Sequence, residues 1–166
     1  KKKDYIKWVD FNVTYQALQD AYQWDIKTHK QEVKLNWITL LAYLASRNGG
    51  DFSNYKSSDM QTVAEVLVNR ENTLEDMSRD KKYYNYYLEA YQAVLGGMVG
   101  DYEIEKEDES GERIWEECYG LKAFSPIAGG FAYDDYDDFG KPRAYGYSRP
   151  HLGHDMMGQI GTPVIA

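Results

Sequence analysis

The hydrophobic period of the chain changes near Gly100, and this change limits the possible folds more than any other feature. Before Gly100, apolar side chains recur every three to four residues, which is typical of the buried face of a helix. The helical runs are Leu18–Ile26, Leu40–Ala45, Met60–Leu67 and Tyr84–Leu95. Beyond Gly100, apolar residues alternate with acidic ones, as in a half-exposed strand. The chain is therefore predicted to be an α+β protein with its helices first.

Residues with capping chemistry flank these helical runs. Asn36 can accept hydrogen bonds from the free N–H groups at the start of the second helix, and Gly49-Gly50 can end that helix. Thr73 followed by Asp76 is the pattern of a short capped turn, and Gly96-Gly97 can close the last helix. These signals agree with the hydrophobic period and predict a compact helical domain.

The same signals divide the chain into three parts. Residues 1–100 are predicted to be a helical accessory domain, and residues 101–120 an acidic β-hairpin linker. Residues 121–166 are rich in Gly, Pro, Tyr and Asp, and are predicted to begin an incomplete antiparallel β domain. Short strands are expected at residues 122–125 and 162–166. Because a half-built sheet exposes its edges, we expect this tail either to be poorly ordered or to pair with a neighbouring chain.

Composition excludes several classes of protein. The 166 residues are 43% apolar, which is enough for a real core, and 19 basic against 27 acidic side chains give a net charge of −8. A general nucleic-acid binder needs the opposite sign. No apolar run approaches the ~20 residues that span a bilayer, so no transmembrane segment is predicted. The single cysteine, Cys118, excludes an internal disulfide and any CxxC metal site.

Chemistry is concentrated in the segment His151-Leu152-Gly153-His154-Asp155. An imidazole and a carboxylate four residues apart are good ligands for a borderline cation such as Zn²⁺, although a surface histidine beside an acid is also a common arrangement. In an extended strand, His151 and Asp155 would lie ~13 Å apart, too far to share one ion. The chain must bend between them, and Gly153 is placed for that bend. His154 is expected on the opposite side.

Three short motifs around this segment resemble the first half of the lysostaphin-type zinc metallopeptidases, which cut peptide bonds in bacterial peptidoglycan. The motifs, in order, are Asp138-Phe139-Gly140-Lys141-Pro142-Arg143, His151-Leu152-Gly153-His154-Asp155 and Gly161-Thr162-Pro163-Val164-Ile165-Ala166. The resemblance implies that His151 and Asp155 bind one Zn²⁺ ion. It also implies a peptidoglycan stem peptide or cross-bridge as substrate, with Arg143 and Tyr145 as predicted substrate-binding residues. In this interpretation the substrate lies in a groove that is also lined by Tyr133, Tyr136 and Tyr147. The alternative is that these tyrosines belong to ordinary loops.

The resemblance also predicts what this chain cannot do. The family takes its third zinc ligand and a catalytic histidine from an HxH motif further on, and the 166 residues contain no HxH. Two ligands do not make a catalytic zinc site, so this stretch alone is expected to be inactive, as a truncated part of a complete enzyme. The complete protein is expected outside the cytoplasm, secreted or membrane-anchored at the cell wall. The alternative is a non-catalytic lysostaphin-like scaffold or cell-wall-binding protein.

The helical half carries a second resemblance. Residues 40–50 are similar to the helix of lysozyme-type transglycosylases that ends in a catalytic Glu-Ser-Gly-Gly, but Arg47 stands in the place of the glutamate. Arginine cannot protonate a glycosidic oxygen, so such a domain would be inactive. A helix ended by a glycine cap explains the same residues. The predicted role of this half is to bind glycan or a partner, or to position the peptidase.

Overall fold

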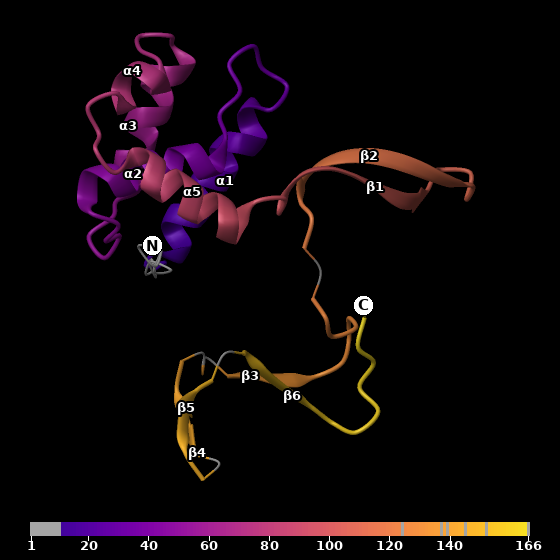
Figure 1. The fold of residues 1–166 in the computed structure, drawn as a ribbon. Coiled ribbons are helices and arrows are strands. Elements are labelled where there is room, and N and C mark those ends of the chain that lie inside the picture. The colour runs from indigo at the N-terminus through magenta and orange to yellow at the C-terminus, as the bar shows by residue number, and fades with distance from the viewer. Residues whose placement is uncertain are drawn as a thin grey trace, which may run out of the picture. The chain divides into compact units, whose positions relative to one another are not determined.

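A computed structural model describes residues 11–123, 125–136, 138, 140–144, 146–151 and 153–165. The chain forms two compact units, the first ending at Lys122 and the second beginning at Ala123. Figure 1 shows helices followed by a long hairpin in the first unit and short strands in the second. The predicted α+β class, with helices first, is confirmed.

The helical part of the first unit contains the expected helices, together with the short capped turn that was expected at Thr73. The helices are α1 (Tyr15–Thr28), α2 (Trp37–Asn48), α3 (Ser57–Val68), α4 (Leu74–Ser78) and α5 (Tyr84–Leu95). Asn36 caps α2 by accepting from the N–H groups of Ile38 and Thr39, and Thr73 caps α4, as predicted. Gly49 ends α2 with a positive φ of 72°, a conformation that glycine adopts without steric cost.

The hydrophobic core of this unit is built around α2. This helix packs against α1, α3 and α5, which explains why its sequence is apolar on nearly every side. Its buried residues are Trp37, Ile38, Leu40, Leu41, Ala42, Tyr43, Leu44 and Ala45. Within the described residues, no helix is both long enough and apolar enough to cross a membrane.

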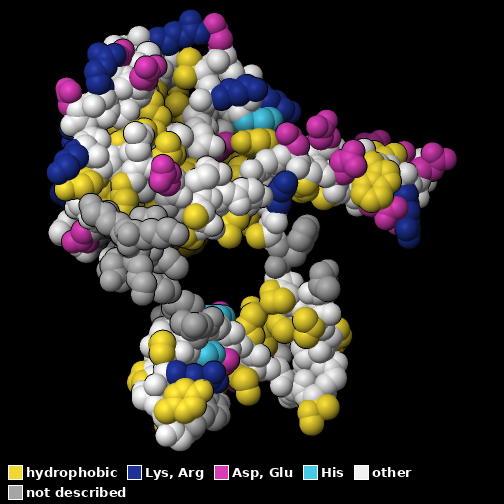
Figure 2. Space-filling model, viewed as in Figure 1, with side chains coloured by type: hydrophobic (Ala, Val, Ile, Leu, Met, Phe, Trp, Pro, Cys, Tyr) yellow, Lys and Arg dark blue, Asp and Glu magenta, His cyan; other side chains and the backbone are white. Residues whose placement is uncertain are grey.

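The acidic segment after Gly100 forms the predicted β-hairpin. Strands β1 (Val99–Glu107) and β2 (Arg113–Leu121) pair antiparallel along their whole length. Asp108 organises the turn, since its carboxylate accepts hydrogen bonds from the backbone N–H groups of Ser110 and Glu112. Figure 2 shows acidic side chains along this hairpin.

The base of the hairpin is fixed to α1. The Tyr119 hydroxyl donates to Asp25 Oδ1 at 2.7 Å, and the Tyr119 ring stacks on His29 with centroids 4.1 Å apart. The Leu121 N–H donates to the Tyr22 hydroxyl at 3.3 Å. The segment that the sequence predicts as a linker therefore belongs, in the structure, to the same compact unit as the helices.

In the residues that the structure describes, the second unit contains two small antiparallel sheets. Strand β3 (Tyr133–Tyr136) pairs with β6 (Asp155–Gly158), and β4 (Pro142–Ala144) pairs with β5 (Ser148–Pro150). Apolar side chains are exposed on this unit, and Figure 2 shows several of them. They include Phe131, Tyr133, Tyr136, Tyr147, Met157, Ile160, Val164 and Ile165.

The prediction of strands at residues 122–125 and 162–166 is wrong for the described residues there. The structure has instead a single bridge between Ile127 and Val164, with Ile165 N–H donating to the Pro126 carbonyl at 2.8 Å. Pro126 and Pro163 lack the N–H groups that a regular ladder needs, which limits pairing to this short contact.

Candidate metal centre

Strand pairing in the second unit brings chemically active side chains together from separate segments. Tyr136 pairs with Asp155, so Asp138, two residues beyond the end of β3, lies next to the start of β6. His151 follows β5 directly, and its N–H donates to the Lys141 carbonyl at 2.9 Å. The Asp155 N–H donates to Asp138 Oδ1 at 3.3 Å, which ties the two acidic residues together.

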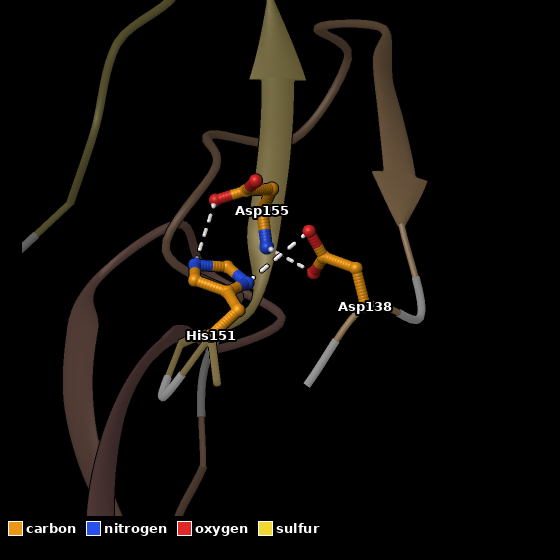
Figure 3. A group of neighbouring side chains, drawn as sticks. All are labelled: Asp138, His151 and Asp155. Carbon is orange, nitrogen blue, oxygen red and sulfur yellow. Dashed lines mark hydrogen bonds and ion pairs between the residues drawn. The ribbon is translucent and has the colours of Figure 1, made fainter. Parts of the chain in front are cut away.

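The result is a cluster of one imidazole between two carboxylates, drawn in Figure 3. His151 Nε2 lies 3.5 Å from Asp155 Oδ1, and His151 Nδ1 lies 3.2 Å from Asp138 Oδ2. Each of the three residues offers one ligand atom, and these atoms all lie within 4.8 Å of one another. Asp138, His151 and Asp155 could therefore hold a metal ion.

The chain bends between His151 and Asp155, as the sequence requires. The bend includes Gly153, and a Cβ atom built at that position would lie 3.2 Å from His151 Nε2. A side chain at this position would therefore require the imidazole to shift by a few tenths of an ångström. Because Gly153 has no side chain, the chain can bend there so that the ligand atoms of His151 and Asp155 turn toward each other.

Arg143, predicted to bind substrate, lies in the middle of β4 and reaches into the same cluster. Its Nη2 forms ion pairs with Asp138 Oδ2 and Asp155 Oδ2, and lies 3.3 Å from His151 Nδ1. The guanidinium group thus contacts both carboxylates, and its single positive charge offsets one of their two negative charges. Tyr145, the other predicted substrate-binding residue, lies outside the described residues.

Asp138 is the most buried member of the cluster, with 8% of its surface exposed. Desolvation raises the pKa of its carboxyl, but hydrogen bonding to Asp155 and the charges of His151 and Arg143 lower the pKa by more. The pKa of Asp138 therefore lies below its ordinary value, and the group is a carboxylate at neutral pH. His154, expected on the opposite side, contacts Asp135 and does not belong to the cluster.

The sequence prediction missed Asp138 as a member of the site. The motif Asp138-Phe139-Gly140-Lys141-Pro142-Arg143 predicts a role for Arg143 alone. Asp138 is one of several acids in a short acidic stretch, and nothing local separates it from Asp134 or Asp135. The pairing of β3 with β6 brings Asp138 to the cluster, and this pairing joins residues about twenty positions apart in the sequence.

The donor set fits a zinc ion. In tetrahedral coordination with bonds of about 2.1 Å, two ligand atoms lie about 3.4 Å apart. The distance of 3.5 Å from His151 Nε2 to Asp155 Oδ1 is close to this value. An imidazole with carboxylate oxygens is also a ligand chemistry that zinc accepts.

No family model, curated protein or solved structure matches this chain. The resemblance to lysostaphin-type peptidases therefore rests on the residues of the short motifs. The structure adds that one of these motifs places an imidazole and a carboxylate at metal-binding distance.

Proposed function

We propose that this chain carries part of the zinc site of a bacterial cell-wall endopeptidase that hydrolyses amide bonds in peptidoglycan peptides. His151 and Asp155 are its zinc ligands in this chain. The observation that carries the proposal is the 3.5 Å separation of His151 Nε2 and Asp155 Oδ1, within a motif that resembles the family's first zinc motif. A bound zinc ion supplies Lewis-acid chemistry, polarising the scissile carbonyl and activating water.

The residues of this chain bind and orient the zinc ion in this proposal, but they do not complete the catalytic site. His151 binds the cation through an unprotonated ring nitrogen, so protons compete with the ion for this ligand. The chain contains no HxH motif, so its residues supply neither the family's third ligand nor its catalytic histidine. The 166 residues alone are therefore expected to bind zinc without hydrolysing peptidoglycan.

Arg143 is placed to serve the substrate in this proposal. Peptidoglycan peptides carry free carboxylates, and a guanidinium group binds carboxylates with two parallel hydrogen bonds. Arg143 is about one-third exposed and already contacts carboxylates within the cluster. We assign Tyr145, two residues further along the sequence, as a second substrate contact. The proposed location is the cell wall, outside the cytoplasm.

A non-catalytic scaffold is the second candidate, and one observation favours it. Arg143 pairs with both carboxylates of the cluster, so each carboxylate already has a cationic partner without a metal ion. In a scaffold this ion pair would be a permanent structural link that joins β4 to β6. The two candidates differ in whether the protein binds zinc and whether it hydrolyses peptidoglycan.

Peptidoglycan digestion by the longest natural form of this chain tests the proposal. We expect new amino groups to be released, the release to stop with a chelator, and added zinc to restore it. Asp155→Ala should abolish the activity, while Asp134→Ala, which removes an exposed carboxylate of β3, should keep it. Zinc binding without any release of amino groups would favour the scaffold.

A further inference from the structure

The two ring nitrogens of His151 face different carboxylates, and this separates the roles of the two aspartates. Nδ1 faces Asp138 Oδ2 at 3.2 Å, whereas Nε2 faces Asp155 Oδ1 at 3.5 Å (Figure 3). An imidazole nitrogen that binds a metal ion cannot also carry a proton. An ion held between His151 and Asp155 therefore uses Nε2, and leaves the Nδ1 proton to face Asp138.

The two aspartates also differ in how far their oxygens are already occupied. Asp138 Oδ1 accepts from the Asp155 N–H at 3.3 Å, and Asp138 Oδ2 contacts both Arg143 and His151. Asp155 uses Oδ2 for Arg143, and its Oδ1 faces the imidazole nitrogen. The side chain of Asp155 is 39% exposed, against 11% for Asp138. Asp155 can thus offer an oxygen to an incoming ion more readily than Asp138.

Arg143 Nη2 competes with Asp138 for the same nitrogen, at 3.3 Å from Nδ1. If Nδ1 carried no proton, it would accept from Arg143. Arg143, however, already donates to two carboxylates, which are stronger acceptors than a neutral imidazole. With the proton on Nδ1, Asp138 Oδ2 gains a donor, and the Nε2 lone pair and Asp155 Oδ1 are two acceptors that face each other, as the ligands of a shared cation do.

We propose that Asp138 is a positioning residue: it accepts a hydrogen bond from His151 Nδ1–H and thereby turns the Nε2 lone pair toward a divalent cation shared with Asp155. This inference rests on the proposed function, because it assumes that His151 and Asp155 bind the metal. Histidines that bind metals commonly donate their other N–H to a carboxylate, which fixes the ring and strengthens the ligand. The buried, fully occupied carboxylate of Asp138 has that position and chemistry.

Zinc affinity, measured by calorimetry on the full chain, tests the positioning role. Asp138→Ala should weaken zinc binding about 10–100-fold, the usual cost of removing such a partner. Asp138→Glu should restore much of the affinity, because it returns a carboxylate that can reach Nδ1. Asp134→Ala is the matched control and should leave the affinity unchanged. An Asp138→Ala affinity equal to wild type would overturn the proposal.

Cobalt spectroscopy separates a positioning residue from a third ligand. Cysteine at a ligand position produces a thiolate-to-cobalt charge-transfer band. Asp138→Cys loaded with Co²⁺ should therefore show no more of this band than Asp134→Cys, with the wild type correcting for Cys118. A strong band confined to Asp138→Cys would make Asp138 a ligand and overturn the proposal.

Nitrogen-15 spectra of the zinc-loaded wild type need no substitution, and so do not depend on whether a variant folds. We expect His151 to carry its proton on Nδ1 and zinc on Nε2, and the opposite assignment would contradict the proposal. If the wild type binds no zinc, the proposed function fails and this inference fails with it. If zinc binds and is lost in Asp155→Ala but not weakened in Asp138→Ala, only this inference fails.

Discussion

Replacing Tyr119 with Phe should destabilise the first compact unit, because the Tyr119 hydroxyl ties the hairpin to α1. That hydroxyl donates to Asp25 Oδ1 at 2.7 Å, and Asp25 is only 2% exposed. A hydrogen bond to a charged group contributes about 1.5–3 kcal/mol, and removing the donor leaves a buried oxygen with one partner fewer. We therefore expect Tyr119→Phe to lower the free energy of unfolding by about 1.5–3 kcal/mol.

Asp25→Ala should cost more, since Asp25 has a second donor. The Trp37 N–H at the start of α2 donates to Asp25 Oδ2 at 2.9 Å, so the alanine variant leaves two donors without their acceptor. The expected loss is about 2–6 kcal/mol, since each buried donor left without an acceptor costs about 1–3 kcal/mol. In the double variant the two effects should not add, because both substitutions remove the same hydrogen bond.

Urea unfolding followed by tryptophan fluorescence measures these losses. Tyr102→Phe is the matched control from the same hairpin, because the Tyr102 hydroxyl makes no hydrogen bond to the residues that the structure describes. Its effect should stay within about 0.5 kcal/mol. A Tyr119→Phe variant as stable as Tyr102→Phe would refute the docking of the hairpin through Asp25.

Three further predictions concern the helices, the tyrosines and the bend of the cluster. Asn36→Ala should cost about 1 kcal/mol in urea unfolding, because it removes the acceptor that caps α2, and an unchanged midpoint would contradict this. Burial raises the pKa of Tyr91 to about 12, and burial followed by the Asp25 contact raises the pKa of Tyr119. Because the folded state favours the protonated phenols, stability should be complete below about pH 10 and fall as pH rises above it, which urea midpoints at several alkaline pH values would show. Gly153→Ala should weaken zinc binding about tenfold in calorimetry, since its Cβ would crowd His151 Nε2 at 3.2 Å, and equal affinity would show that the imidazole moves at no cost.

Local signals in the sequence predict the helical part well. The hydrophobic period, the Asn36 and Thr73 caps and the Gly49 end are all properties of a few neighbouring residues, and the structure contains each of them. The hairpin follows from alternation and a polar turn for the same reason. The docking of Tyr119 on Asp25 joins residues 94 positions apart, and no local pattern indicates it.

The cluster shows the same division between local and distant information. The bend at Gly153 could be predicted, because two ligands four residues apart cannot share an ion in an extended strand. That Asp138 belongs to the cluster could not be predicted, because its place beside His151 depends on the register between β3 and β6. The prediction of strands at residues 122–125 and 162–166 is wrong because it rests on the hydrophobic period alone. That period does not register Pro126 and Pro163, which lack the N–H groups that a regular ladder needs.

Zinc binding by the longest natural form of this chain, beside its Asp155→Ala variant, is the most direct test of the central claim. Metal analysis and calorimetry should find one tightly bound zinc ion per chain in the wild type, and its loss in the variant. Circular dichroism should show that the variant is folded, so that the loss reports on the ligand. A wild-type protein that binds no zinc would contradict the account. The ion pairs of Arg143 with Asp138 and Asp155 would then be a purely structural link.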